Sequence, residues 1–437
     1  MTLHKAWWVL ATLATAARAT AQQTAAAPAD SLRLGALQAD AVRLDPRQRQ
    51  LQLQTSATNL RLRNIAAERL PSLSANGQAQ YQSEVTRLAV PIPGVTIPSP
   101  PHDTYDARLN AQESLFDPTI APRRNVERAQ LAESQAQVRV TLFGLRQEVT
   151  DAFFTAASLA ERASTVEATI TDLAARLREA QMRLREGAAT PSDTASFAAT
   201  MLQRRQDLLQ LRADRGAALA RLSELVGRPI PPDAPVALPD LAASAATAIG
   251  ALDQLRARPE YEQFRASRDR IALQEAVTAA QEKPRVSAFG RVGYGKPGLS
   301  VLSTEFQSYW LAGVQVQWAP WTWGSTDRDR QVLEVQREII ATNEAAFTET
   351  LRRNIQQSIA TIARLDSTLA LDARIIALRE SVDRESRAKL QEGAITAADY
   401  VDRNTDLLAA RLALVQHRVE LSQARANLLT MLGVEVR

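Results

Sequence analysis

The chain repeats itself, and this repeat limits the folds that it can adopt. Residues 184–193 read LREGAATPSD, and residues 390–399, at an offset of 206, read LQEGAITAAD. A second match pairs residues 71–81 with residues 284–294 at an offset of 213. Because the two matches occur in the same order, they predict a duplication in which each half folds as one copy of the same unit.

Each half reads as helix, then strands, then a very long helical hairpin. In the first half, a helical pattern is broken at Asp45-Pro46, and a later helical stretch of some 65 residues would span roughly 100 Å. That length exceeds the helices of ordinary globular domains. The last helix also has apolar residues at heptad spacing, such as Val401, Leu408 and Val415, which indicates a coiled-coil seam.

These patterns divide the chain into a leader and two repeats. The predicted boundaries are 1–21 for a signal peptide, 22–240 for repeat 1 (membrane strands at about 70–117, hairpin at 118–226, Pro-rich linker at 228–240) and 241–437 for repeat 2 (membrane strands at about 284–321, hairpin at 325–432). The leader rests on Lys5, a mostly apolar stretch over 6–17 and the small-x-small sequence Ala19-Thr20-Ala21. The alternative for these residues is a first helix of the fold.

Composition excludes several classes of function. The chain has no Cys, which excludes disulfides, thiol nucleophiles, Cys-based zinc sites and a lipid anchor on Cys. A net charge of +4 gives no sign of a nucleic-acid partner, and three His residues leave little for a metal site. His102 falls in a Pro-rich loop and His417 in the last helix, where surface positions are expected. We therefore expect no catalytic residue, no cofactor and no resident metal, and hence no enzyme.

The strand-like segments carry the membrane signal. Over residues 309–323, apolar and polar side chains alternate, as in a strand with two unlike faces. All four Trp residues that follow the leader lie there, at Trp310, Trp318, Trp321 and Trp323, as in the aromatic girdle of an outer-membrane barrel. The alternative is a small soluble sheet with an aromatic core. Four strands cannot close a barrel in lipid, so a membrane position would require several chains, and three chains would supply twelve strands.

Taken in order, these segments resemble the TolC family of outer-membrane efflux proteins. The resemblance is carried by Leu44-Asp45-Pro46, by the strand starts 70–74 and 283–287, and by the tips Glu186-Gly187 and Glu392-Gly393. It implies a mainly α fold with a small β part: duplicated coiled-coil hairpins that form a periplasmic tunnel, plus four strands per chain in a shared 12-stranded outer-membrane barrel.

The resemblance also implies a function and partners. It implies a homotrimer in the outer-membrane lipid that extends into the periplasm and acts as the passive exit duct of a tripartite pump for small molecules. Its partners would be a periplasmic adaptor and an inner-membrane pump. The alternatives are the exit duct of a type I protein secretion system and a soluble periplasmic scaffold. The sequence names neither the exported substrate nor the adaptor and pump.

The two tips have a physical interpretation of their own. Gly187 and Gly393 suit the left-handed end of a helix, and Thr190 and Thr396 suit the N-caps of the helices that follow. The resemblance assigns these four residues to the contact with the adaptor.

Three carboxylates at the tips are candidates for a periplasmic gate. Asp193 and Asp399 also fit capping boxes, whereas Asp402, one turn beyond Asp399, has no capping role. In the family, carboxylates that match Asp399 and Asp402 face the tunnel at its periplasmic constriction. The Tyr and Arg that lock the family's gate match Leu390 and Ile395 here, so those polar locks are missing.

Overall fold

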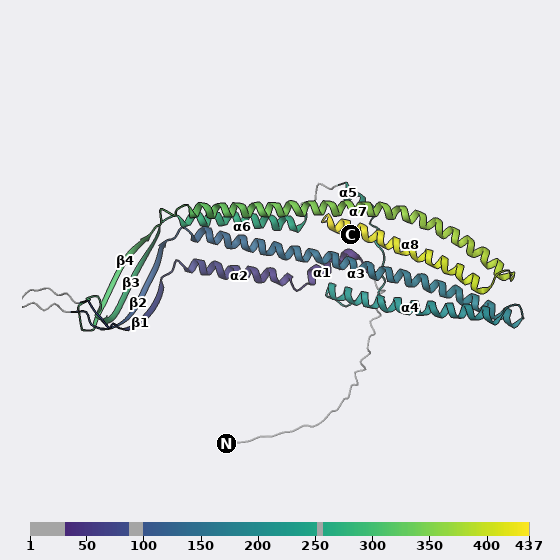
Figure 1. Ribbon diagram of the computed structural model, residues 1–437, viewed down its shortest axis with the longest axis horizontal. Helices are drawn as coiled ribbons and strands as arrows, with labels where there is room; N and C mark the ends of the chain where they lie inside the picture. Colours follow the sequence, from purple (N-terminus) through teal and green to yellow (C-terminus); the bar gives the residue numbers. More distant parts are fainter. Residues whose placement is uncertain (1–30, 87–98, 251–256, 437) are drawn as a thin grey trace, which may run out of the picture.

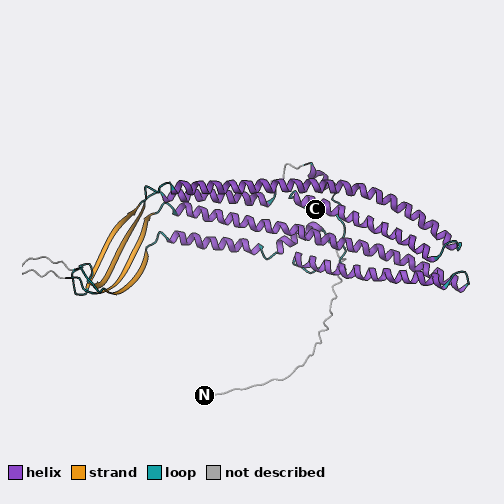
Figure 2. Ribbon diagram, viewed as in Figure 1, coloured by secondary structure: helices purple, strands orange, loops and turns teal. Residues whose placement is uncertain are grey.

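The protein is a long bundle of helices with a small sheet at one end (Figures 1 and 2). A computed structural model describes residues 31–86, 99–250 and 257–436. The predicted signal peptide, 1–21, lies outside these residues, as does most of the Pro-rich loop in the first half. Within the described ranges, no helix combines the length and the apolar composition that crossing a membrane requires.

The elements follow one another in the same order in both halves. The first half contains α1 (Leu34–Leu44), α2 (Gln48–Ala67), β1 (Ser72–Tyr81), β2 (Asp103–Phe116), α3 (Ile120–Arg185) and α4 (Pro191–Val226). The second half contains α5 (Ala242–Ile249), α6 (Pro259–Gln281), β3 (Arg285–Lys296), β4 (Gln307–Gln317), α7 (Ser325–Gln391) and α8 (Ala397–Met431). The predicted fold class, mainly α with duplicated long hairpins and four strands, is confirmed.

The break between α1 and α2 shows how local sequence sets a boundary. Asp45 has extended backbone (ψ 131°), which is the conformation that the residue before Pro46 prefers. The Asp45 carboxylate accepts hydrogen bonds from the backbone N–H of Arg47 at 2.7 Å and from its guanidinium at 2.8 Å. The hydrogen bonds from Arg47, led by those of its side chain, lower the pKa of Asp45. The corner is therefore held by charge-assisted bonds in place of the missing helical ones.

The four strands form one antiparallel sheet in the order β1-β2-β3-β4, with β1 and β4 at its edges. Residues opposite one another in such a sheet point to the same face, so the register defines two faces. One face is mostly apolar. Its apolar members are Leu73, Ala75, Gly77, Ala79, Tyr81, Tyr105, Ala107, Leu109, Ala111, Val286, Ala288, Gly290, Val292, Tyr294, Trp310, Ala312, Val314 and Val316. The same face also carries Asp103, Glu113, Lys296 and Ser308.

The opposite face of the sheet is mostly polar. It carries Asn76, Asp106, Arg108, Asn110 and Arg291, among others. Arg291 Nε donates to Asn110 Oδ1 at 2.9 Å, and Arg108 pairs with Asp106 at 3.0 Å. The sheet therefore has one face suited to lipid and one suited to water.

The main hydrophobic core lies where α3, α7 and α8 meet α1 and α5, about midway along the bundle. Phe153 and Phe154 of α3 are fully buried there and meet edge to face, with ring centroids 5.3 Å apart. The predicted heptad of α8 contributes to this core through Val419, Ala426 and Leu429, all of which are buried. Packing of these faces, more than helix propensity, stabilises the long helices.

Candidate functional site

Both hairpin tips end their first helix in the same way. Gly187 (φ 75°) and Gly393 (φ 72°) adopt left-handed backbone. In each tip the glycine N–H donates to the carbonyl three residues before it, and the next N–H donates to the carbonyl five residues before it, at 2.8 Å. This is the Schellman arrangement, which satisfies carbonyls at a helix end. A Cβ at either glycine would meet nothing within 4 Å, so the backbone angle alone calls for glycine.

Both tips also begin their second helix in the same way. The Thr190 hydroxyl accepts a hydrogen bond from the Asp193 N–H, and the Asp193 carboxylate accepts one from the Thr190 N–H at 2.9 Å. Thr396 and Asp399 form the same capping box, with the corresponding bond at 3.0 Å. The hydrogen bonds from Thr190 lower the pKa of Asp193, and those from Thr396 lower the pKa of Asp399. Both carboxylates therefore have a structural role as caps.

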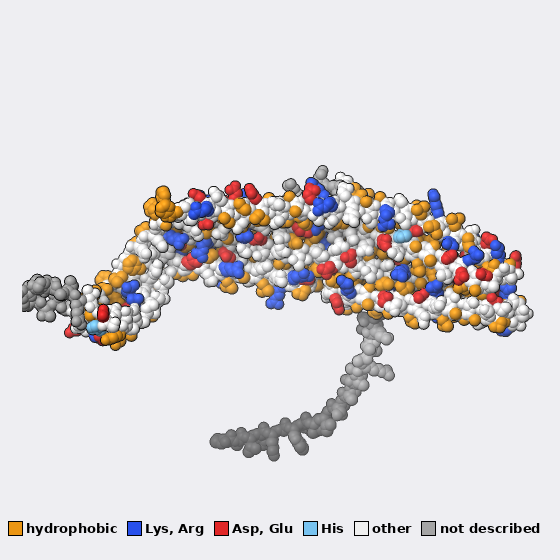
Figure 3. Space-filling view, viewed as in Figure 1, with side chains coloured by type: hydrophobic (Ala, Val, Ile, Leu, Met, Phe, Trp, Pro, Cys, Tyr) orange, Lys and Arg blue, Asp and Glu red, His pale blue; other side chains and the backbone are white. Residues whose placement is uncertain are grey.

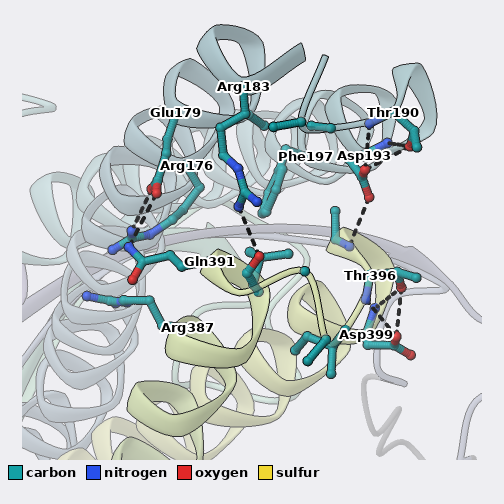
Figure 4. A pocket seen from close by; sticks show the side chains of 18 of the residues that line it. Arg176, Glu179, Arg183, Thr190, Asp193, Phe197, Arg387, Gln391, Thr396 and Asp399 are labelled. Carbon is teal, nitrogen blue, oxygen red and sulfur yellow. Dashed lines mark hydrogen bonds and ion pairs between the residues drawn. The ribbon is translucent and has the colours of Figure 1, made fainter. Parts of the chain in front are cut away.

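Only one of the two capping carboxylates reaches the other tip. Asp193 Oδ1 accepts a hydrogen bond from the backbone N–H of Ala397, the first residue of α8, at 3.1 Å (Figure 4). Arg183 of α3 makes a second link by donating to the carbonyl of Leu390 at 2.9 Å. These two bonds tie the α3–α4 tip to the α7–α8 tip.

The two tips enclose a cavity of about 530 Å³. Its lining includes three arginines, Arg176, Arg183 and Arg387, and the aromatic ring of Phe197 (Figure 4). Next to it, Phe197 packs on Tyr400, with ring centroids 6.0 Å apart, and both side chains are fully buried. Burial raises the pKa of the Tyr400 phenol.

Sequence reasoning named Asp193 but missed its bond to the other tip, and it missed Arg183 altogether. Arg183 and Lys389 occupy equivalent positions in the two repeats, four residues before the tip glycine, so the repeat offered a signal for a basic residue there. The sequence repeat does not show which partner each of the two basic side chains contacts. Lys389 pairs with Glu385 on its own helix at 2.7 Å, whereas Arg183 crosses to the other hairpin.

Asp402 is an exposed side chain of α8. Within the described part of the chain it makes no side-chain hydrogen bond and no ion pair, in contrast to Asp399, one turn before it. The structure of one chain therefore leaves the carboxylate free, and its position in a ring of several copies stays a prediction.

The Trp residues differ in their surroundings, although all four are exposed. Trp310 lies on the apolar face of the sheet, opposite Val292. The sequence predicted strand as far as Trp321, but β4 ends at Gln317, and Trp318 to Trp323 form the connection to α7. This connection contains Pro320, which has no N–H to donate to a strand ladder.

Within that connection, the indoles make local contacts. Trp318 Nε1 donates to the Glu282 carbonyl at 3.0 Å, and the rings of Trp321 and Trp323 meet edge to face at 5.8 Å. Hydrophobic side chains gather at this junction of sheet and bundle (Figure 3). A position of the four Trp side chains at the lipid–water interface stays a prediction.

His417 is half-buried, not a surface residue as predicted. Its Nδ1 lies 2.7 Å from Oδ2 of Asp372, a buried carboxylate on α7. This contact gives the buried Asp372 carboxylate a polar partner, and it connects α7 to α8. Among the described residues, no group of three or more His, Cys, Asp or Glu side chains is arranged to hold a metal ion.

Long helical hairpins joined to a two-faced, four-stranded sheet make up the TolC-like fold, which is also that of solved outer-membrane channels. Solved structures share this fold at low sequence identity. The outer membrane protein VceC from Vibrio cholerae is 17% identical, with a TM-score of 0.64 over 92% of this chain and 97% of that one. The MtrE outer membrane channel of Neisseria gonorrhoeae is 18% identical, with a TM-score of 0.64 over 93% and 90%. CusC, a protein that forms a transmembrane channel, is 16% identical, with a TM-score of 0.68 over 92% of each chain.

A sequence comparison matches the first half of the chain to a known family. Residues 36–228 match the family model described as outer membrane efflux protein. No curated protein sequence matches the chain. The resemblance seen in the sequence is thereby confirmed over residues 36–228, and the solved structures share the fold of the chain.

Proposed function

We propose that three copies of this chain form a channel in the outer membrane that serves as the passive exit duct of a tripartite pump for small molecules. The observation that carries this proposal is the sheet, which has an apolar face, a polar face and two unpaired edges, β1 and β4. An unpaired edge exposes backbone N–H and carbonyl groups that hydrocarbon cannot satisfy.

A ring of several chains removes both unpaired edges. If β1 of one copy pairs with β4 of the next, every backbone group of the sheet gains a partner and the barrel closes. Four strands per chain give twelve strands for three copies, which lies within the range of bacterial outer-membrane barrels. The apolar face then contacts lipid and the polar face lines a pore, and residues 1–21 would direct the chain out of the cytoplasm.

The helices continue the duct on the periplasmic side. α3, with 66 residues, and α7, with 67 residues, each extend for roughly 100 Å. That length places the tips far from the membrane. There, Gly187, Thr190, Gly393 and Thr396 would contact a periplasmic adaptor, which in turn binds an inner-membrane pump.

The tip carboxylates would form the gate. Repeated three times, Asp399 and Asp402 would give acidic rings that attract cations. Asp193 would act differently, since its bond to Ala397 ties the two tips of one chain together. Members of the TolC family lock the gate with a Tyr and an Arg that this chain lacks. Here Asp193 and Arg183 would hold the tips together instead.

Two measurements test this proposal. The full-length protein, expressed with its leader, should be recovered from the outer membrane and should have a native mass of three chains in detergent. Recovery from the soluble periplasm as a monomer would contradict it and favour a scaffold.

The second measurement concerns lipid contact. In proteoliposomes, quenchers carried on lipid chains should quench Trp310 strongly, because it lies on the apolar face of the sheet. A variant that keeps only Trp310 gives the signal, and a variant that keeps only Trp323, at the junction with α7, gives a matched comparison. Quenching of Trp310 by aqueous agents alone would contradict a membrane position for the sheet.

A further inference from the structure

The polar face of the sheet carries more positive than negative charge. Among the strand residues that the structure places on this face, Asp106 is the only acid, and the bases are Arg108, Arg285 and Arg291. The proposed barrel turns this face toward the pore. Any charge that these side chains leave without a partner therefore acts on the molecules that pass.

The carboxylate of this face is already bound by two partners. Arg108, on the same strand as Asp106, donates to its Oδ2 atom at 3.0 Å. The hydroxyl group of Tyr309, on β4, donates to the Oδ1 atom of the same carboxylate. Asp106 therefore balances the charge of Arg108 and has both of its oxygens occupied.

Tyr309 reaches this carboxylate because two glycines make room for it on β3. β3 lies between β4 and β2, so the side chain of Tyr309 has to cross it. Gly293 lies opposite Tyr309, and a Cβ there would lie 2.6 Å from the Cζ atom of the ring. A Cβ at Gly295 would lie 3.0 Å from Asp106 Oδ1. The ring therefore lies over the backbone of β3, and its hydroxyl group helps to hold Asp106 beside Arg108.

Arg291 makes no ion pair within the described ranges. Its Nε donates to Asn110 Oδ1 at 2.9 Å, and the amide of Asn110 donates to Asn76 Oδ1 at 2.8 Å. These bonds hold Arg291 by its Nε and leave its terminal amino groups without a partner among the described residues. Arg285 differs, because its Nε lies 3.9 Å from a carboxylate oxygen of Asp117. Arg291 is thus the charge of the polar face that the described residues leave without a counter-ion.

We propose that Arg291 forms, in the assembled channel, a cationic ring that binds anions in the lumen of the barrel. The inference rests on the proposed function, because it needs the polar face to line a pore shared by three copies. The ligand is an anion with carboxylate or phosphate groups, since the free end of a guanidinium matches two oxygens of either group. The ring adds to the duct a site for the anionic part of an exported molecule.

The dimensions of the barrel make this charge effective across the lumen. Twelve strands, about 4.8 Å apart and tilted by about 40°, give a circumference of about 75 Å and a backbone radius of about 12 Å. The side chain of Arg291 projects inward from this wall, so its charge lies closer to the axis than its backbone does. At physiological ionic strength the screening length is about 8 Å. An anion on the axis is therefore within about one screening length of all three charges.

The ring is distant from the acidic residues of the tips. Asp399 and Asp402 lie at the far end of helices that extend for roughly 100 Å, many times the screening length of about 8 Å. The two ends of the duct would therefore act on a passing ion independently. Cations would be attracted at the tips, and anions would be attracted in the barrel.

Block of the channel by multivalent anions tests the ring. The probes are citrate, which carries carboxylates, and inorganic pyrophosphate, added to the full-length trimer in planar bilayers while the conductance is measured. The test variants are Arg291→Gln, which removes the charge, and Arg291→Lys, which keeps it. The matched control is Arg285→Gln, which removes an arginine from the same strand and face, six residues or roughly 20 Å away. That distance exceeds the screening length, so the control separates a local site from the net charge of the lumen.

The expected result is specific to Arg291. For at least one of the two anions, the concentration that gives half block should rise about tenfold or more in Arg291→Gln, because charge-assisted hydrogen bonds are lost, and should stay within about threefold in Arg291→Lys and Arg285→Gln.

Three outcomes would overturn the ring while the proposed function stands, provided that the protein conducts and has the native mass of three chains. They are unchanged block in Arg291→Gln, an equal loss in Arg285→Gln, and a loss in Arg291→Lys as large as that in Arg291→Gln. If the wild-type protein has the native mass of one chain and does not conduct, both the ring and the proposed function are wrong.

Discussion

The two hairpin tips share a sequence motif but differ in what the motif holds together. Each tip has a left-handed glycine, a Thr N-cap and a capping Asp. Asp193 of the first tip accepts a third bond, from Ala397 of the second tip, whereas Asp399 is exposed and bonds only within its own cap. The duplicated motif thus fixes the local turn, and the surroundings decide whether its carboxylate also links two hairpins.

The basic residues before the tips show the same contrast. Arg183 crosses to the Leu390 carbonyl, whereas Lys389 stays on its own helix with Glu385. The guanidinium of Arg has several donors in a fixed plane and can hold a carbonyl at the far side of the cavity. The capping Asp and the basic residue of repeat 1 therefore both bond to the other tip, whereas their counterparts in repeat 2 bond only within their own hairpin.

The largest effect is expected from removal of the link through Asp193. Asp193→Ala should lose the cap, at about 1 kcal/mol, and also the acceptor for the Ala397 N–H. Hydrogen exchange in the first turn of α8 should become at least tenfold faster, and the channel should be open for a larger fraction of time in planar bilayers.

Asp399→Ala is the matched control for this prediction. It removes the same kind of cap but no contact between the tips, so exchange should accelerate within its own turn and the open fraction should rise less than in Asp193→Ala. Equal effects of the two substitutions on channel opening would show that Asp193 is only a cap.

The second prediction concerns the exposed carboxylates of repeat 2. Asp402→Ala should lower the selectivity for cations and weaken block by multivalent cations, because it removes one charged ring without touching a cap. Reversal potentials under a salt gradient measure this change. Unchanged selectivity in an intact trimer would make Asp402 an ordinary solvated position.

A third prediction concerns the glycines, for which the two tips should behave alike. Gly187→Ala and Gly393→Ala should each destabilise their turn by about 1–2 kcal/mol, because alanine is strained in left-handed backbone. Hydrogen exchange at the two turns measures the change. A large difference between the two substitutions would mean that one turn carries a contact beyond the Schellman arrangement.

The smallest effect is expected from pH. The pKa of Asp193 is lowered from 3.8, so its stabilising contribution is fully present above that value and is lost as the pH falls through the lower, folded pKa. Between about pH 5 and pH 8, protection of the Ala397 amide, corrected for intrinsic exchange, should therefore be constant. A loss of protection already at pH 5 would contradict the assigned role of the Asp193 carboxylate.

Much of the fold could be predicted from the sequence because it depends on local patterns. Proline sets the break at Asp45-Pro46, and glycine sets the tips at Gly187 and Gly393. A period of two residues sets the alternation in β4. The end of β4 at Gln317 was missed, because aromatic residues suggested strand beyond the point where Pro320 interrupts it.

The link between the tips could not be predicted for a different reason. It joins Asp193 to a backbone N–H about 200 residues away, and a backbone donor has no sequence signature. The buried pair of Asp372 and His417 was missed because a coiled-coil pattern gives the positions of apolar residues but does not show which polar ones are paired.

The order of the helices has a mechanical consequence. α3 and α7 run without a break from the sheet to the tips, while their neighbours change from α2 and α6 to α4 and α8 along the way. At no level between the sheet and the tips do all helices end together, so no cross-section of the bundle interrupts every helix. A force applied at the tips would therefore be transmitted through the middle of the bundle by the unbroken helices α3 and α7. The shorter helices would support them on either side of the level where α2 and α6 are replaced by α4 and α8.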